Sequence, residues 1–223
     1  MALVMIAFTV VNWIQTGVIS ETGSILAFVF GAGSKSLALA FAFGSLAFDD
    51  ESENMGGFGS TVYFAIKRDI ASWPTAATDP STDDQAAVLS GNFTMESGKY
   101  FFEVYGTPDT VGVSAESQGE RDAKSYKIKG ELLYPSTRKA AQAFARKINN
   151  AHGVVIMVDP NTGQRHQFGS ELLPCTFSAS VDFGKAPADR RGTKIMFECD
   201  SFIPSWIYQG TIPLSGATLP GVS

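Results

Sequence analysis

Short apolar runs and apolar–polar alternation recur along the chain after residue 55. Residues 61–66 form one such run, and residues 123–133 alternate, with Tyr126 and Ile128 interleaved with Lys127 and Lys129. Both patterns are typical of β-strands, because successive side chains of a strand point to opposite faces. We expect strands over residues 61–66, 87–94, 100–105, 123–133, 154–158, 164–168, 174–181, 193–202 and 205–212. The lysine face of residues 123–133 must then meet water or a partner.

Residues rich in Gly, Pro, Asp, Asn and Ser separate these strands. They predict turns at residues 95–99, 107–109 and 159–163, a polar connector at 117–122, and exposed loops at 79–84 and 183–192. Pro74 disfavours a helical conformation at Trp73, so residues 67–74 are expected to leave the first strand as a loop. The turn at 159–163 is short enough to predict a hairpin.

One segment, residues 136–150, has helical periodicity. Its apolar positions are Ala141, Phe144, Ala145 and Ile148, and its opposite side carries Arg138, Gln142 and Arg146. This spacing predicts an amphipathic helix of about four turns whose alanine-rich side packs on a sheet. Ser136 or Thr137 is expected to cap its start. Asn149, Asn150 and Gly153 are expected to end it in left-handed conformations.

Strands on both sides of a lone helix define the fold class that we expect. Eight to ten strands with one helix predict a mainly β fold, a β-sandwich or partly closed barrel with the helix of residues 136–150 on its flank. We assign residues 55–223 to this β-rich domain and residues 1–54 to a hydrophobic N-terminal arm or extension.

The arm has three interpretations. Residues 2–19 carry no charge and reach the length of a membrane-span candidate, although Asn12, Gln15 and Thr16 interrupt them. In residues 37–43, Leu and Phe alternate with Ala, which favours a buried β arm or hairpin instead. A start site at Met55, after the acidic residues 49–54, would make the preceding residues non-native. No positive region precedes the first stretch, so a secretory signal is not expected.

Composition narrows the function classes. The chain has a hydrophobic content of 44%, with 22 glycines and 17 phenylalanines, which fits a folded, β-rich protein. Its net charge of −5 argues against a surface that grips nucleic acid, because such a surface needs clustered Lys and Arg. Cys175 and Cys199 lie in two expected strands; we favour two buried free thiols, and they could pair if those strands are neighbours.

Motifs for catalysis, cofactors and metals are not found. Residues 31–36 contain Gly-Ala-Gly-Ser-Lys-Ser but lack two glycines of a phosphate-binding loop. Residues 159–163 resemble the start of a calcium loop, yet Ser170 stands where the bidentate Glu is needed. His152 and His166 have no partner His at metal-ligand spacing. The Asn92-Phe-Thr94 triplet matches a glycosylation acceptor, a pattern common by chance. We expect no enzyme, no cofactor and no metal site.

Residues 119–210 resemble tail tube proteins of tailed bacteriophages, in particular a group in phages and prophages of Bacteroidetes-type hosts. The resemblance is carried by turn and strand-end residues, namely Gly119-Glu120, Tyr134-Pro135, Asn149-Asn150, residues 154–159, Gln167 to Gly169, Leu173-Pro174, Asp189 to Gly192 and Pro204 to Gly210. Weaker likeness includes Gly56, Gly57 and residues 66–74 and 91–98, so about three quarters of the chain is covered.

The resemblance implies a virion structural protein. Protomers of such a protein join edge to edge into a ring, commonly of six, and the rings stack into a conduit through which DNA passes without specific binding. Partners would be further copies of the chain and other tail proteins, with assembly in the bacterial cytoplasm. An acidic lumen would repel DNA phosphates. Polar loops such as residues 79–84 and 183–192 suit contacts between stacked rings.

Two other functions remain open. One is a head or neck decoration protein of a phage, and the other is a membrane-anchored β-domain that binds a partner and uses residues 2–19 as its anchor. For the tail tube, we predict that Arg138 and Arg146 face a neighbouring subunit or the outer solvent and not the lumen.

Overall fold

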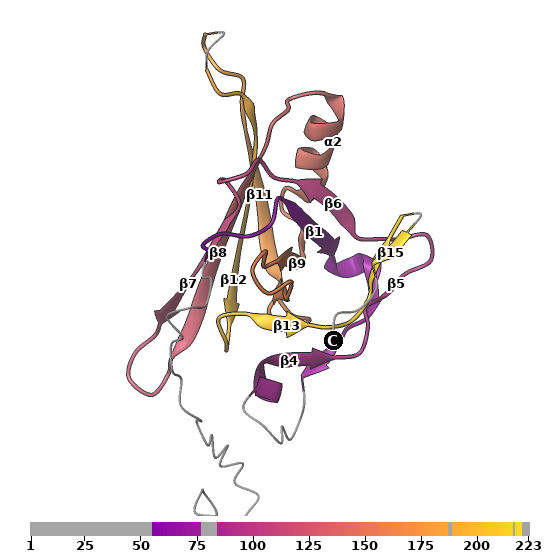
Figure 1. Ribbon diagram of the computed structural model, residues 1–223, viewed down its shortest axis with the longest axis vertical. Helices are drawn as coiled ribbons and strands as arrows, with labels where there is room; N and C mark the ends of the chain where they lie inside the picture. Colours follow the sequence, from indigo (N-terminus) through magenta and orange to yellow (C-terminus); the bar gives the residue numbers. More distant parts are fainter. Residues whose placement is uncertain (1–54, 77–83, 187–188, 216, 220–223) are drawn as a thin grey trace, which may run out of the picture. The chain divides into compact units, whose positions relative to one another are not determined.

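The computed structural model describes residues 55–76, 84–186, 189–215 and 217–219 (Figure 1). All of them belong to the second of two units of the chain, Phe48–Ser223. The predictions for residues 1–54, including the phosphate-loop-like residues 31–36, lie outside the described residues, as does nearly all of the loop at 79–84.

Eleven strands form one branched sheet. Its first part has the order β6-β1-β9-β10-β13-β4-β3, and we call it the seven-stranded sheet. The bounds along this order are Phe102–Tyr105, Thr61–Ile66, His152–Val158, Arg165–Phe168, Trp206–Tyr208, Val88–Ser90 and Thr75–Ala76. Its neighbours are antiparallel except for β13 and β4, which are parallel.

The second part, the four-stranded sheet, has the order β11-β12-β8-β7 and is antiparallel throughout. Its strands are Cys175–Asp182, Gly192–Ser201, Ser125–Tyr134 and Gly112–Gln118. It joins the seven-stranded sheet where the first residues of β11 pair with His152 and Gly153 of β9.

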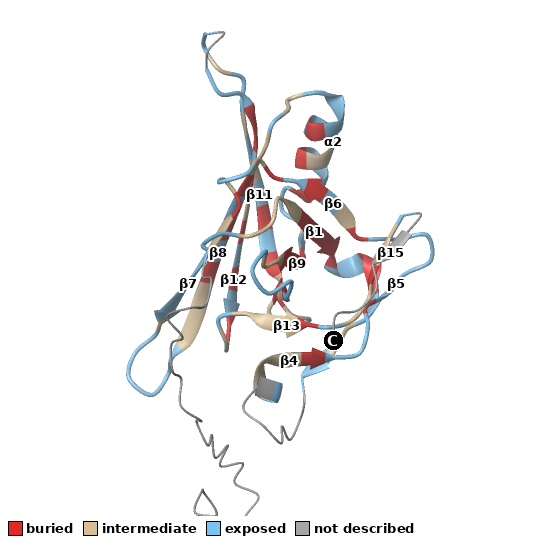
Figure 2. Ribbon diagram, viewed as in Figure 1, coloured by how far each residue is buried: buried red, intermediate tan, exposed pale blue. Residues whose placement is uncertain are grey.

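The main core lies between the two parts. β1, β9 and β10 contribute side chains from one sheet, and β8, β11 and β12 contribute them from the other. Figure 2 colours the buried segments of β1, β8, β9, β11 and β12 red. The largest of these buried side chains are Phe64, Met157, Ile128, Leu132, Phe177 and Ile195. The arrangement confirms the expected mainly β, sandwich-like fold with one helix among the described residues.

A second core covers the other face of β1 and β9. Tyr63, Ala65, Val154 and Ile156 point into it, so both faces of these two strands are buried. The cover comes from Phe93 and Tyr208, from Ile212 of β14 (Ile212–Leu214), and from the small sheet of β2 (Ile70–Ser72) and β5 (Thr94–Met95). Continuous apolar runs, rather than alternation, therefore identify the central strands.

The helix α2 spans Lys139–Ile148 and is shorter than the predicted 136–150. Its N-cap residue is Arg138, without a side-chain cap, and the Ser136 hydroxyl instead accepts a hydrogen bond from the Arg138 N–H at 3.2 Å. The predicted cap by Ser136 or Thr137 is therefore wrong. The predicted buried side is confirmed, because Ala141, Ala145 and Ile148 are buried.

The structure gives Gly153 a different role from the predicted one at the end of the helix. Asn150 has a left-handed φ of 62°, as expected, but Asn149 has a φ of −59° and does not. Gly153 does not have a positive φ and lies within β9, where a Cβ would overlap the backbone carbonyl oxygen of Ala65. Close approach of β1 and β9, rather than turn conformation, explains this glycine.

Several strand predictions are corrected by the pairing. Residues 87–94 and 100–105 contain β4, β5 and β6, but β4 pairs with β3 and β13 while β6 pairs with β1. Residues 67–74 hold a 3-10 turn, Lys67–Asp69, and β2 instead of a loop alone. The strand β7 was not expected, and it makes residues 119–124 a hairpin turn to β8. Two- and three-residue strands raise the number to fifteen among the described residues.

Candidate functional site

One face of the four-stranded sheet is mainly polar, and we call it the outer face. The other face carries the core side chains, because burial alternates along β12 and β8. The charged side chains of the outer face are Glu116, Lys127, Lys129, Glu131, Asp182, Lys194, Glu198 and Asp200. The prediction that the lysine side of residues 123–133 meets water is confirmed for Lys129, which is exposed.

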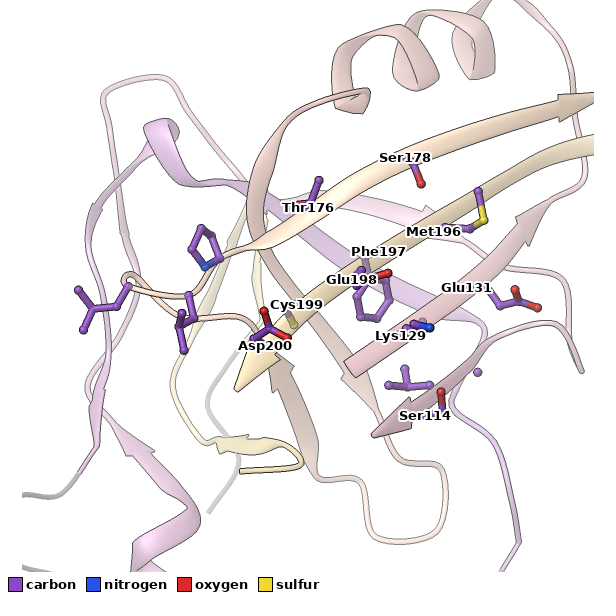
Figure 3. A pocket seen from close by; sticks show the side chains of 16 residues that line it. Ser114, Lys129, Glu131, Thr176, Ser178, Met196, Phe197, Glu198, Cys199 and Asp200 are labelled. Atoms are coloured by element: carbon purple, nitrogen blue, oxygen red, sulfur yellow. The ribbon is translucent and has the colours of Figure 1, made fainter. Parts of the chain in front are cut away.

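A broad groove of about 990 Å³ runs over this face (Figure 3). Ser114, Lys129, Glu131, Ser178, Met196 and Glu198 line it from four neighbouring strands, as the close view shows. At one end it reaches Leu172, Leu173 and Pro174. The groove therefore offers carboxylates, the ammonium group of Lys129 and hydroxyls on neighbouring strands.

Several charges on the outer face have partners on other strands of the four-stranded sheet. Lys194 of β12 pairs with Glu131 of β8 at 2.7 Å, and Lys127 pairs with Glu198 at 2.5 Å. The hydrogen bond and the charge of Glu198 raise the pKa of Lys127 above its ordinary value. The Gln118 amide donates to the Asp200 carboxylate at 2.8 Å. These contacts are solvent-exposed, so they order the surface more than they stabilise the fold.

Two edges of the four-stranded sheet are open in the described part of the chain. β7 pairs with β8 alone. β11 pairs with β9 only at Cys175 and Thr176, and the Phe177 N–H donates to the Ala151 carbonyl at 3.0 Å. Beyond that point, residues 178–182 of β11 have no ladder on this side among the described residues. Unpaired N–H and C=O groups at such edges are ready to pair with another chain.

The two ends of this sheet expose large apolar side chains. Phe183, in the connection between β11 and β12, is 65% exposed. At the opposite end, Leu172 before β11 and Phe202 after β12 are 87% and 75% exposed. Large apolar side chains exposed this far are typical of contact surfaces when they gather at one place.

The histidines form hydrogen bonds with hydroxyl groups. His166 Nδ1 lies 2.9 Å from the Ser205 Oγ, and burial lowers the pKa of His166, while the charge of Asp159 opposes this. His152 Nδ1 lies 3.1 Å from the Thr176 Oγ1. A neutral imidazole beside a hydroxyl can act as a base, but neither Ser205 nor His166 lines the groove or the smaller cavity beside β6. The pair holds β10 to the segment before β13.

The calcium-like residues 159–163 form the predicted hairpin turn between β9 and β10. The Asp159 carboxylate accepts hydrogen bonds from the Asn161 N–H at 2.9 Å and from the Thr162 hydroxyl at 2.7 Å. Burial opposes ionisation of Asp159, yet these hydrogen bonds lower its pKa. The Gly163 N–H closes the turn on the Asp159 carbonyl at 2.8 Å, so the carboxylate serves the turn.

The remaining candidates are separate from one another. Asn92 is exposed, and its side-chain oxygen accepts a hydrogen bond from the Thr211 N–H at 2.8 Å. Cys175 and Cys199 are both buried and free, on adjacent strands.

Within residues 55–76, 84–186, 189–215 and 217–219, no cluster of three His, Cys, Asp or Glu side chains could hold a metal ion. No helix of these residues is long and apolar enough to span a membrane.

Comparison with protein-family models, with curated proteins and with solved structures finds no match for this chain. The geometry of the outer face and of the open strand edges must therefore carry the functional argument. The sequence predicted the exposed lysine side of β8, but it did not predict β7, which supplies one open edge. The strand pattern of β7 is weak because its sequence, Gly-Val-Ser-Ala-Glu-Ser-Gln, has mostly small and polar residues.

Proposed function

We propose that the chain is a non-enzymatic virion structural protein that self-assembles into stacked rings, the tail tube of a phage, through which DNA passes. The resemblance of residues 119–210 to tail tube proteins suggests this function. The observation that carries it is the pair of open edges, β7 and residues 178–182 of β11, on the two sides of one four-stranded sheet.

Pairing of β7 in one copy with β11 in the next would remove both edges. Continued in this way around a closed ring, the four-stranded sheets have no unpaired edge strand, which is how barrels avoid aggregation. Because the two edges differ, the contact is heterologous, and heterologous contacts generate rings when the rotation closes. The ring in this proposal thus satisfies backbone groups that a monomer leaves to water.

The outer face would line the lumen. It carries five carboxylates, from Glu116, Glu131, Asp182, Glu198 and Asp200, against three ammonium groups, from Lys127, Lys129 and Lys194. Two of the lysines are held in ion pairs. A surface with an excess of negative charge, whose lysines are paired with carboxylates, does not bind phosphates tightly. DNA could therefore slide past it.

The helix would then lie away from the lumen. Ile148 of α2 packs in the core with Phe177 of β11, and Phe144 packs edge to face on Phe102 of β6 with ring centroids 6.0 Å apart. These contacts place α2 on the core side of the four-stranded sheet, opposite the outer face (Figure 1). The exposed Arg138 and Arg146 therefore point to solvent or to a neighbouring copy in this arrangement.

Rings would stack through the two ends of the four-stranded sheet. Near Phe183, Lys185, Arg190 and Arg191 are exposed together with Asp182 and Asp189, so this end has a small excess of positive charge. The opposite end exposes Leu172 and Phe202, and its carboxylates from Glu120, Asp122, Glu171 and Asp200 outnumber the basic groups of Arg121 and Lys124. Apolar tips with opposite net charge favour a head-to-tail contact, which extends into a tube.

Proline substitution at the β7 edge tests the proposal. Adjacent residues of an antiparallel edge strand point their N–H groups alternately toward the partner and away from it, so one of Ser114 and Ala115 has a free N–H. The variants Ser114→Pro and Ala115→Pro are compared by thermal unfolding of the monomer and by negative-stain electron microscopy. The variant that keeps monomer stability should form no rings.

Two results separate edge pairing from a general loss of folding. Glu116→Gln, at the same edge but with its backbone N–H intact, is the matched control and should assemble. Ring formation by both proline variants, at a yield equal to that of the unmodified chain, would overturn the assignment of β7 as the ring contact.

A further inference from the structure

Cys175 and Cys199 face each other across the ladder between β11 and β12. The neighbouring pair in this register is Thr176 and Glu198, which places the two cysteines directly opposite at the next position. Their sulfur atoms lie 2.9 Å apart, in thiol–thiol hydrogen-bond contact. Directly opposite residues of antiparallel strands have Cα atoms about 4.5–5.5 Å apart, within the range that a disulfide spans.

The surroundings leave the two sulfurs little room for anything but each other. Cys175 is fully buried and Cys199 is 5% exposed. Gly169 packs on Cys175 so closely that a Cβ at Gly169 would lie 3.0 Å from the Cys175 sulfur. Burial and the contact with Cys199 raise the pKa of the Cys175 thiol well above its ordinary value. A bulky adduct on Cys175 would have to displace backbone.

We propose that Cys175 and Cys199 are an oxidation site, a dithiol that closes to a buried cross-strand disulfide by exchange with a small-molecule disulfide such as oxidised glutathione. Cys199, the less buried thiol, loses its proton and attacks one sulfur of the reagent, which releases one small thiol after proton uptake. The Cys175 sulfur then loses its proton and attacks Cys199, and the second small thiol leaves. Both cysteines are oxidised and one reagent disulfide is reduced to two thiols.

The bond would tie together the two ends of the β11–β12 hairpin. Cys175 lies at the start of β11, where that strand leaves β9, and Cys199 lies near the end of β12. A link there closes a chain loop that contains the whole hairpin, and such links stabilise chiefly by restricting the unfolded chain. The outer face carried by the same strands stays unchanged. This inference does not depend on the proposed tube.

Intact-mass measurement of the full chain tests the site. The folded protein is incubated with oxidised glutathione, quenched with acid, unfolded and treated with iodoacetamide. The expected product takes up no iodoacetamide, and peptide mapping links Cys175 to Cys199 within one chain. Because both thiols are buried, oxidation should be slow and should accelerate in moderate urea, where local opening is more frequent.

Single substitutions provide the controls. Cys175→Ser and Cys199→Ser each keep a single cysteine and cannot form a disulfide within the chain. After unfolding, this cysteine should carry either one alkyl group or one glutathione. A second measurement compares the equilibrium for disulfide formation in the folded chain with that in strong denaturant. We expect a preference of about 30-fold or more for the folded chain, the factor by which a well-placed disulfide stabilises folding.

Three outcomes would overturn the inference. They are a stable glutathione adduct in the folded unmodified chain, a disulfide between two chains, and an equilibrium that favours the disulfide less in the folded chain than in denaturant. The last result would show that the two strands hold the sulfurs in contact but in a geometry that the bond cannot adopt.

Discussion

Gly130 of β8 lies directly opposite Phe197 of β12, and the phenyl ring occupies the space that a Cβ on the glycine would need. Phe197 is buried and packs on Phe168 with ring centroids 5.8 Å apart. The missing side chain thus leaves room for the tip of the Phe197 ring against the backbone of β8. This relationship joins the four-stranded sheet to the main core.

Gly130→Ala should therefore destabilise the fold. The added methyl group would force the Phe197 ring away from its packed position, and such overpacking costs about 1–3 kcal/mol. Gly112→Ala in β7 is the matched control, because no atom lies within 4 Å of its Cβ position, and it should change stability by less than about 0.5 kcal/mol. Urea unfolding measures both. Equal effects of the two variants would contradict the account of Gly130.

Acid should weaken the fold through His166. Burial keeps the pKa of His166 below its ordinary value of 6.5, so the unfolded chain takes up its proton at higher pH than the folded chain. Stability is therefore full above about pH 6.5 and falls as the pH drops from there toward the folded pKa. His166→Gln should flatten this part of the dependence of unfolding free energy on pH, measured by urea unfolding. An unchanged slope in His166→Gln would refute the prediction.

The two arginines of the helix should lie outside the channel. In a reconstruction of the assembled tube by cryo-electron microscopy, Arg138 and Arg146 should face the outer solvent or a neighbouring copy, because α2 packs on the core side of the four-stranded sheet. Lys129 and Glu131 of the outer face should border the lumen. Arginine side chains lining the channel would reverse the proposed orientation.

Tube length should depend on the exposed apolar tips. Phe183→Ser and Phe202→Ser remove the apolar part of the proposed contact between rings without touching the β7 edge, so short stacks or single rings should replace long tubes. Met55→Ser provides a control, because Met55 is also 62% exposed but lies beside Asn161 in a different turn. Tube lengths measured by electron microscopy that are equal in all three variants would argue against this contact.

The local part of the fold could be predicted from the sequence. The apolar run of residues 61–66 is β1 with its predicted bounds, and Asp159 with Gly163 identified the hairpin of β9 and β10. These features depend on side-chain periodicity and on turn chemistry, which act over a few residues. The buried side of the helix followed from the same reasoning, while its cap did not, because Ser136 bonds two residues onward.

The long-range part could not be predicted in this way. The parallel pair of β4 and β13 joins Val88 to Ile207, and nothing in either strand specifies the other. The edge strand β7 is ordered by its ladder with β8 rather than by its own small and polar side chains. The candidate site depends on this pairing, because Lys127 meets Glu198, and Cys175 meets Cys199, only in the observed register.

Electron microscopy of the purified full chain over a range of concentrations tests the central proposal most directly. The account predicts hollow rings at low concentration and stacked tubes at high concentration, with the Ser114→Pro and Ala115→Pro pair separating folding from assembly. A chain that stays a monomer at every concentration, while its folded state is intact by thermal unfolding, would contradict it.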